Sequence, residues 1–154
     1  MTQLKTLYRQ IILDHYKKPR NQGLPSDSSY TTIHQNNPSC GDDITVSIKV
    51  EDSIITDIKH EGSGCSICCA SASIMSEMVK GKSKATAKDL SLEFSKMLLN
   101  QAIDSEKLEE AIAFEGVKDF PARIKCATLG WKALESAIKE EEQSWLKMMQ
   151  PKEK

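Results

Sequence analysis

Hydrophobic and polar positions change their spacing along the chain, from a helical period to a strand period and back. Over residues 3–16, apolar side chains recur every three or four positions, which predicts an amphipathic helix that ends before Pro19. Residues 20–29 are polar and contain Gly23 and Pro25, so they predict a loop.

Three stretches then predict strands. Residues 30–35 form a short candidate, and apolar side chains alternate strictly with polar ones over 44–50 and again over 54–60. A turn at 51–53 joins the last two stretches. We expect a hairpin, extended by the first strand into a three-stranded antiparallel sheet.

Helical spacing returns after residue 64. One helix is predicted to run to about Val79, and another follows a motif at 86–89 that resembles a capping box. Asp104 or Ser105 caps a shorter helix, which we expect Gly116 to end.

A last helix is predicted to begin at Pro121, with a buried stripe of Ile124, Ala127, Trp131, Leu134 and Ile138. The charged tail from about 140 to 154 is expected to fray, with Trp145 able to dock. Strands followed by helices predict a single α+β domain over 1–154, its sheet covered on one face by about five helices.

Net charge, apolar runs and cysteine count exclude several classes of function. The net charge of −1 gives no electrostatic case for nucleic acid or an acidic membrane surface as partner. No apolar run approaches the roughly 20 residues of a membrane span, and the opening residues lack a signal-peptide core, so we expect a cytoplasmic protein. Its five cysteines are then expected to be reduced and to serve metal binding or catalysis.

Cys65 lies where a strand pattern stops and a helix pattern starts. Gly62 and Gly64 permit a tight turn there. The free amide groups and positive dipole end of the helix favour a thiolate at Cys65, which would act either as a metal ligand or as a nucleophile.

The predicted hairpin brings further donors to Cys65. Cys40 and Asp42 stand in the loop that enters the sheet, and Cys65 stands in the turn that leaves it. Gly41 lets Cys40 and Asp42 point toward one centre. If the strands pair, these side chains lie close together.

Cys126 falls in the first turns of the last helix. At 100° per residue it lies about 200° around the axis from Ile124 and about 100° from Ala127. We therefore expect it on the flank of the apolar stripe, beside Arg123 and Lys125, where positive charge favours a thiolate.

Three thiolates and one carboxylate form a four-ligand set, comprising Cys40, Asp42, Cys65 and Cys126. Such donors suit tetrahedral Zn²⁺, and thiolates also suit iron–sulfur clusters. A carboxylate among the ligands favours a site that exchanges ligands over a structural zinc module. The alternative is three unrelated cysteines at turns and helix starts.

Cys68 and Cys69 follow Cys65 on the same helix face. With Cys65, Cys68 makes a formal C-x-x-C motif, which allows a thiol redox pair or half a zinc ribbon. No second C-x-x-C motif is present. The alternative interpretation is that Cys68 and Cys69 are small apolar residues that pack in a buried helix start. His15 and His60 are interpreted as helix-end and strand-end residues rather than ligands.

Three segments together resemble the signatures of IscU/SufU-type iron–sulfur cluster assembly proteins, the NifU N-terminal-like family. They are residues 37–42, residues 62–73 and residues 123–129, and the opening at 7–21 is also similar. The resemblance covers nearly the whole chain in order. It implies a three-stranded antiparallel sheet under several helices and the metal ligands Cys40, Asp42, Cys65 and Cys126.

Two features resemble the SufU branch. Lys125 stands where IscU-type scaffolds have a histidine, and the interval between Cys65 and Cys126 leaves room for an extra helical segment. Cys68 and Cys69 depart from the branch pattern. The resemblance implies bound Zn²⁺, with Fe²⁺ or a transient iron–sulfur cluster as the alternative.

The implied activity is sulfur transfer. A SufS-type cysteine desulfurase would donate persulfide sulfur to Cys40, a SufBCD-type scaffold would receive it, and Arg123 and Lys125 would supply electrostatic support. One alternative is a scaffold that builds a transient [2Fe–2S] cluster on the same ligands. A weaker one is a thiol redox protein that uses Cys65 and Cys68.

Overall fold

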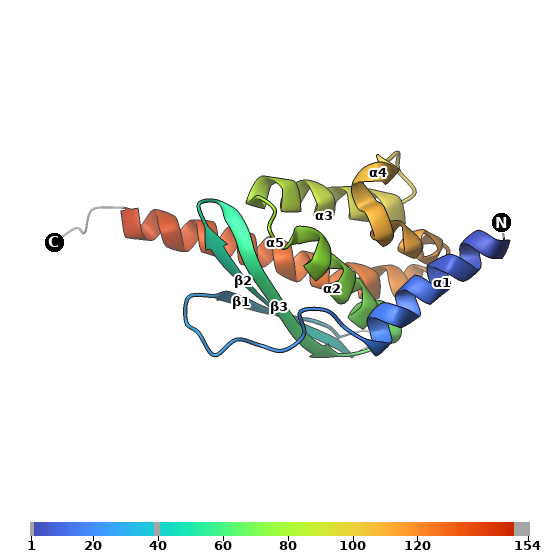
Figure 1. The fold of residues 1–154 in the computed structure, drawn as a ribbon, viewed down its shortest axis with the longest axis horizontal. Helices are drawn as coiled ribbons and strands as arrows, with labels where there is room; N and C mark the ends of the chain where they lie inside the picture. The colour runs from blue at the N-terminus through green and yellow to red at the C-terminus, as the bar shows by residue number, and fades with distance from the viewer. Residues whose placement is uncertain (1, 39–40, 150–154) are drawn as a thin grey trace.

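A three-stranded sheet carries its helices on one side (Figure 1). This computed structural model describes residues 2–38 and 41–149. In chain order the elements are α1 (Thr2–Lys17), β1 (Thr31–Asn37), β2 (Asp42–Glu51), β3 (Ile54–Ser63), α2 (Ser66–Val79), α3 (Lys84–Leu98), α4 (Ser105–Leu108), the 3-10 helix η1 (Glu109–Asp119) and α5 (Pro121–Met149). The α+β class predicted from the sequence is confirmed. None of the helices in the described ranges has the length and apolarity of a membrane span.

The sheet is antiparallel, with β2 between β1 and β3. Ile44, Val46 and Ile48 of β2 are buried, as their alternating spacing predicts. Because β2 and β3 form a hairpin, the first residues of β2 pair with the last residues of β3, with Asp43 opposite Ser63. The sheet therefore delivers the start of β2 and the exit of β3 to the same edge.

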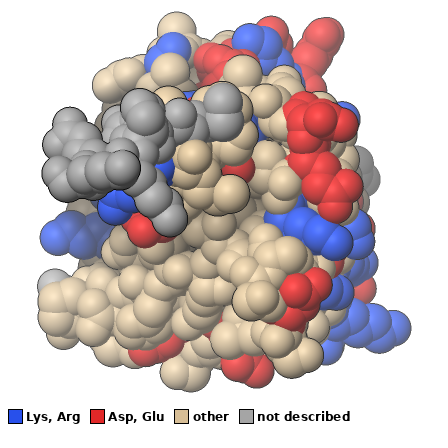
Figure 2. Space-filling view, turned by 90° about the vertical axis from the view of Figure 1, so that its left-hand side faces the viewer, with Lys and Arg blue, Asp and Glu red and all other residues tan. Residues whose placement is uncertain are grey.

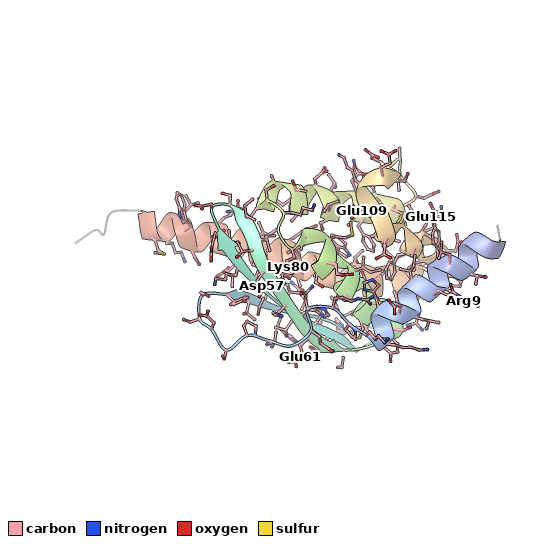
Figure 3. The ribbon with its side chains drawn as sticks, viewed as in Figure 1. Arg9, Asp57, Glu61, Lys80, Glu109 and Glu115 are labelled. Carbon is pink, nitrogen blue, oxygen red and sulfur yellow. The ribbon has the colours of Figure 1, made fainter. Side chains whose placement is uncertain are left out.

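Helices α2 and α5 pack against each other and against the sheet. A Cβ on Gly130 of α5 would lie 3.3 Å from the Cβ of Ala72 in α2, so glycine permits this close approach. Trp131 stacks on Phe94 of α3 with ring centroids 4.9 Å apart. At the other end of α2, Lys80 pairs with Asp57 of β3 at 3.2 Å (Figure 3). These contacts hold α2 against α5 and β3, and α5 against α3.

Two predicted helix boundaries are wrong. Helix α3 begins at Lys84 rather than at Thr86, because Ser83 is its N-cap and accepts a hydrogen bond from the Thr86 N–H at 3.1 Å. The segment predicted to end at Gly116 continues as η1 to Asp119. A Cβ added at Gly116 would meet nothing within 4 Å, and this glycine is not the end of that segment.

The tail expected to fray from about residue 140 is instead helical as far as Met149. Lys84 and Lys88 of α3 pair at 2.9 Å with Glu141 and Glu142 of α5, which tethers this part of the helix. Trp145 stays 55% exposed, at the rim of a cavity of about 580 Å³ between α5 and the β2–β3 turn. Figure 2 shows this end of the molecule, a broad uncharged area with charged side chains around it. Residues 150–154 lie outside the described residues.

Candidate metal centre

Asp42, Cys65 and Cys126 converge at the edge of the sheet where β2 begins. One ligand atom from each residue, a carboxylate oxygen or a sulfur, lies within 4.8 Å of the other two. The three side chains come from the start of β2, the start of α2 and the first turns of α5. Residues separated by more than twenty positions along the chain therefore share one small volume.

Asp42 links β2 to α2. Its side chain is only 2% exposed, and its Oδ1 accepts a hydrogen bond from the backbone N–H of Cys65 at 3.0 Å. The Cys65 sulfur lies 3.5 Å from Oδ2 of the same carboxylate. Cys65 is the N-cap residue of α2, in extended conformation, which agrees with its predicted place at the start of the helix. The carboxylate thus satisfies an amide group at a helix start and faces a sulfur at the same time.

Gly64 makes this approach possible. A Cβ at Gly64 would lie 2.5 Å from Oδ1 of Asp42 and 2.8 Å from its Cγ, which is closer than real atoms come. A side chain at Gly64 would push the Asp42 carboxylate away from Cys65.

Cys126 is fully buried, contrary to the prediction of a flank position. Residues 126–130 are buried in succession, because this part of α5 is covered by α2 as well as by β1 and β2. A helical wheel with one apolar stripe does not apply where a helix is enclosed on several sides. The Cys126 sulfur contacts the carbonyl oxygen of Ala122 at 3.7 Å.

A buried hydrogen-bond chain sets the distance between Cys65 and Cys126. The Ser71 hydroxyl of α2 donates to the carbonyl of Ala127 at 2.6 Å, and the Trp131 indole N–H donates to the same hydroxyl at 3.2 Å. Since Ser71 is six positions after Cys65 and Ala127 directly follows Cys126, this chain fixes the two helix starts relative to each other.

Arg123 interacts with both cysteines. The negative charge of a Cys65 thiolate, followed by a hydrogen bond with Cys126, raises the pKa of the Arg123 guanidinium. Arg123 itself is exposed. Lys125, the next basic residue along the helix, is also exposed. Of the two basic residues that the sequence paired, Arg123 is the one whose electrostatics we tie to both thiols.

The remaining cysteines have different positions. Cys40 lies outside the described residues, so its predicted roles as ligand and sulfur acceptor stay predictions. Cys68 is part of the hydrophobic core, in line with the interpretation as an apolar filler. Cys69 is half-buried at the edge of the cluster, and burial, with Cys65 and Asp42 nearby, raises the pKa of its thiol.

Neither His15 nor His60 contributes to this centre. His60 is buried, and its Nε2 donates to the carbonyl of Arg20 at 2.7 Å. His15 is buried against α2 and lies beside Glu77 and Glu110, a grouping that the sequence did not reveal. No sequence pattern indicates this grouping, because Glu77 and Glu110 belong to two separate helical segments that are both far from His15 in the sequence.

The donors that converge at the sheet edge suit a divalent metal. Two sulfurs and one carboxylate oxygen already lie within 4.8 Å of one another. Zn²⁺ binds thiolates at about 2.3 Å and carboxylates at about 2.0–2.2 Å, usually with four ligands in a tetrahedron. Gly41, one position before Asp42, adopts φ +77° in a turn at the entrance to β2.

The fold and the site are those of a family of iron–sulfur cluster assembly proteins. Residues 7–127 match the profile of the NifU-like N terminal domain, and the chain belongs to that family.

Two relatives and one solved structure illustrate the similarity. The zinc-dependent sulfurtransferase SufU of Bacillus subtilis (strain 168) is 51% identical over 90% of this chain and 94% of its own length. The iron–sulfur cluster assembly scaffold protein IscU of Streptococcus pyogenes serotype M1 is 41% identical over 90% and 87%. The crystal structure of a putative iron–sulfur cluster assembly scaffold protein for the SUF system, from Fervidobacterium islandicum AW-1, has a TM-score of 0.77 and 34% identity, covering 84% of this chain and 94% of that one.

Proposed function

We propose that this protein is a zinc-dependent sulfur carrier in iron–sulfur cluster assembly. The observation that carries the proposal is the convergence of Asp42, Cys65 and Cys126 at one edge of the sheet. In the proposal Cys40 is the fourth ligand, since it stands two residues before Asp42. The similarity to a relative named a zinc-dependent sulfurtransferase supports zinc and sulfur transfer together.

The donor set favours a metal that is held but can exchange a ligand. Zn²⁺, when bound, keeps its cysteines deprotonated at neutral pH and so preserves them as nucleophiles. Asp42 is buried, and one of its oxygens is already engaged by the Cys65 amide. This second contact orients the carboxylate, as outer-shell hydrogen bonds do for metal ligands.

Cys40 is the proposed sulfur acceptor. Its thiolate attacks the outer sulfur of a persulfide on a partner cysteine desulfurase. A new sulfur–sulfur bond forms on Cys40, the partner's sulfur–sulfur bond breaks, and the partner cysteine leaves as a thiolate. The proton on the transferred sulfur moves with it, so no oxidant or reductant is needed.

Arg123 is proposed to support this transfer. Its guanidinium lies against Cys65 and Cys126 and is exposed on its other side, where an incoming anionic sulfur or a partner carboxylate can reach it. A SufS-type desulfurase as donor, a SufBCD-type scaffold as acceptor and a cytoplasmic location, where thiols stay reduced, complete the proposal.

Transfer of radiolabelled sulfur from a SufS-type desulfurase tests the function. The wild-type protein should accept label and stimulate the desulfurase, and Cys40→Ala should abolish both effects. Cys69→Ser is the matched control, because Cys69 is a partly exposed thiol at the edge of the same cluster. Full stimulation by Cys40→Ala would contradict the assignment of Cys40.

A scaffold for a transient [2Fe–2S] cluster is the second candidate. The similarity to relatives named IscU scaffold proteins favours it, and thiolates suit clusters as well as zinc. Anaerobic reconstitution of the zinc-loaded protein with iron and sulfide separates the two. A cluster that displaces zinc and persists supports the scaffold, whereas retained zinc without cluster absorption supports sulfur transfer.

A further inference from the structure

A second group of metal-binding side chains lies apart from the cysteine cluster. His15 of α1, Glu77 of α2 and Glu110 of η1 each place one ligand atom within 4.8 Å of the other two. Glu77 stands twelve positions after Cys65, so the two groups are about 16–18 Å apart along α2.

His15 is the buried member of this group. It is only 2% exposed, and its Nε2 lies 3.6 Å from Oε1 of Glu77 and 3.6 Å from Oε1 of Glu110. These are ion-pair distances when the imidazole carries a proton. A metal cation between the ring nitrogen and the two carboxylate oxygens would take the place of that proton.

The other ring nitrogen of His15 is held in place. Its Nδ1 shares a hydrogen bond with the Ser73 hydroxyl at 2.8 Å, and the Ser73 oxygen accepts the backbone N–H of Arg20 at 2.8 Å. Histidines that bind metals generally use the second ring nitrogen for such a hydrogen bond, which fixes the ring orientation and directs the free nitrogen toward the metal. Ser73 and the Arg20 amide thus aim Nε2 of His15 at the carboxylates.

The local charge favours a divalent cation. The guanidinium of Arg20 pairs with Asp14 at 2.5 Å and lies 3.8 Å from Glu77. The shorter ion pair of Arg20 is with Asp14, so Glu77 is only partly neutralised by this guanidinium. Glu109 of η1 lines the same cavity as Glu77 and Glu110 and adds a further acidic group.

A cavity beside the two glutamates has room for water ligands. Glu77, Glu109 and Glu110 line this cavity of about 170 Å³ together with Ile74 and Met78. A water molecule takes up about 30 Å³, so the cavity holds several waters next to the carboxylates. Neighbouring ligands of an octahedral ion with bonds of roughly 2.1 Å are about 3 Å apart, and a small closure of the two glutamates reaches this spacing.

We propose that His15, Glu77 and Glu110 bind a divalent first-row cation of the Mn²⁺ or Fe²⁺ type. One imidazole and two carboxylates, without sulfur, match the preferences of these ions. Bound there, the cation joins α1, α2 and η1, which contact one another at this end of the molecule (Figure 1). The proposal does not depend on the function of the cysteine cluster.

Mn²⁺ titration of the full-length, zinc-loaded protein tests the site, with the EPR signal of free Mn²⁺ as the readout. Because zinc occupies the cysteine site, added Mn²⁺ is expected to bind at His15, Glu77 and Glu110. We expect one Mn²⁺ per chain with half-saturation below ~1 mM. Glu77→Gln and Glu110→Gln should each weaken binding by about tenfold or more.

Glu115→Gln is the matched control, since Glu115 lies on the same 3-10 helix but outside the group. It should bind Mn²⁺ like the wild type. Glu110 is 60% exposed, so its variant should fold, and equal melting temperatures without Mn²⁺ check this. No Mn²⁺ binding by the wild type, or equal binding by wild type and both glutamine variants, would overturn the proposal.

Discussion

Oδ1 of Asp42 accepts the backbone N–H of Cys65 at 3.0 Å while Oδ2 of the same carboxylate lies 3.5 Å from the Cys65 sulfur. One side chain at the start of β2 therefore stabilises the first turn of α2 and stands beside a candidate metal-binding thiolate. Helix start and metal centre are coupled through a single buried carboxylate.

Two substitutions separate these two roles of Asp42. Asp42→Asn keeps an acceptor for the Cys65 amide but removes the charge, so zinc affinity should fall by roughly 100-fold or more. Asp42→Ala removes the acceptor as well and should lower the free energy of unfolding of the zinc-free protein by about 1–2 kcal/mol relative to Asp42→Asn. Competition with a zinc chelator and urea unfolding measure the two effects. Equal zinc affinity in wild type and Asp42→Asn would exclude Asp42 as a ligand.

Gly64→Ala tests whether close approach at this glycine shapes the site. The added Cβ would meet Asp42 Oδ1 at 2.5 Å, so the carboxylate must move and zinc should bind at least about tenfold more weakly. Gly116→Ala is the control, because nothing lies within 4 Å of its added Cβ. Chelator competition on both variants decides the matter, and unchanged zinc binding by Gly64→Ala would show that the carboxylate position is not critical.

Arg123 and Lys125 should differ in their effect on sulfur transfer. Arg123→Ala removes the cation that lies against Cys65 and Cys126 and should lower desulfurase stimulation by about tenfold, the equivalent of one charge-assisted hydrogen bond. Lys125→Ala, at an exposed neighbouring position, should change it by less than about twofold. Zinc content is measured in parallel and should remain at the wild-type level. Equal losses in the two variants would mean that general positive charge matters, not contact with the thiols.

Stability should decline as the pH falls below about 6.5, the ordinary pKa of histidine. Burial lowers the pKa of His60 in the folded state, although its bond to the Arg20 carbonyl acts in the opposite direction. A histidine with a lowered folded-state pKa takes up its proton more readily when unfolded, so its stabilising contribution is complete above pH 6.5 and is lost below it. Burial lowers the pKa of His15 in the same way.

Urea unfolding between pH 8 and pH 5 measures this dependence. His60→Gln keeps an N–H donor without a group that titrates, so its stability should fall less steeply over this range than that of the wild type. His34→Gln is the control, because His34 is exposed at the sheet surface and glutamine keeps a donor for its contact with Asp43. A wild-type profile that is flat between pH 7 and pH 5 would contradict the expectation.

Local patterns predicted the elements well, and they predicted the proximity of Asp42 and Cys65. Alternation over 44–50 and 54–60 implied a hairpin, and a hairpin necessarily brings Asp42 toward Cys65. The burial of Cys126 escaped prediction because a helical wheel describes one apolar face, whereas α5 is enclosed here by α2 and the sheet. The start of α3 was misplaced for a different reason. One side-chain hydrogen bond makes Ser83 the N-cap, and from the sequence alone Thr86 is an equally suitable N-cap.

The group of His15, Glu77 and Glu110 had no sequence signal at all. Its members stand on three segments with no common motif, and each looks ordinary in its own helix. Only the packing of α1 and η1 against α2 brings them together, and this packing depends on contacts between distant residues. Sites of this kind become visible from the tertiary structure alone.

X-ray absorption at the zinc edge gives the most direct test of the metal centre. The zinc-replete wild-type protein should show three sulfur ligands at about 2.3 Å and one oxygen at about 2.0 Å. Cys126→Ser should lose one sulfur from that shell. Four sulfur ligands and no oxygen in the wild type, or an unchanged sulfur count in Cys126→Ser, would contradict a centre built from Cys40, Asp42, Cys65 and Cys126.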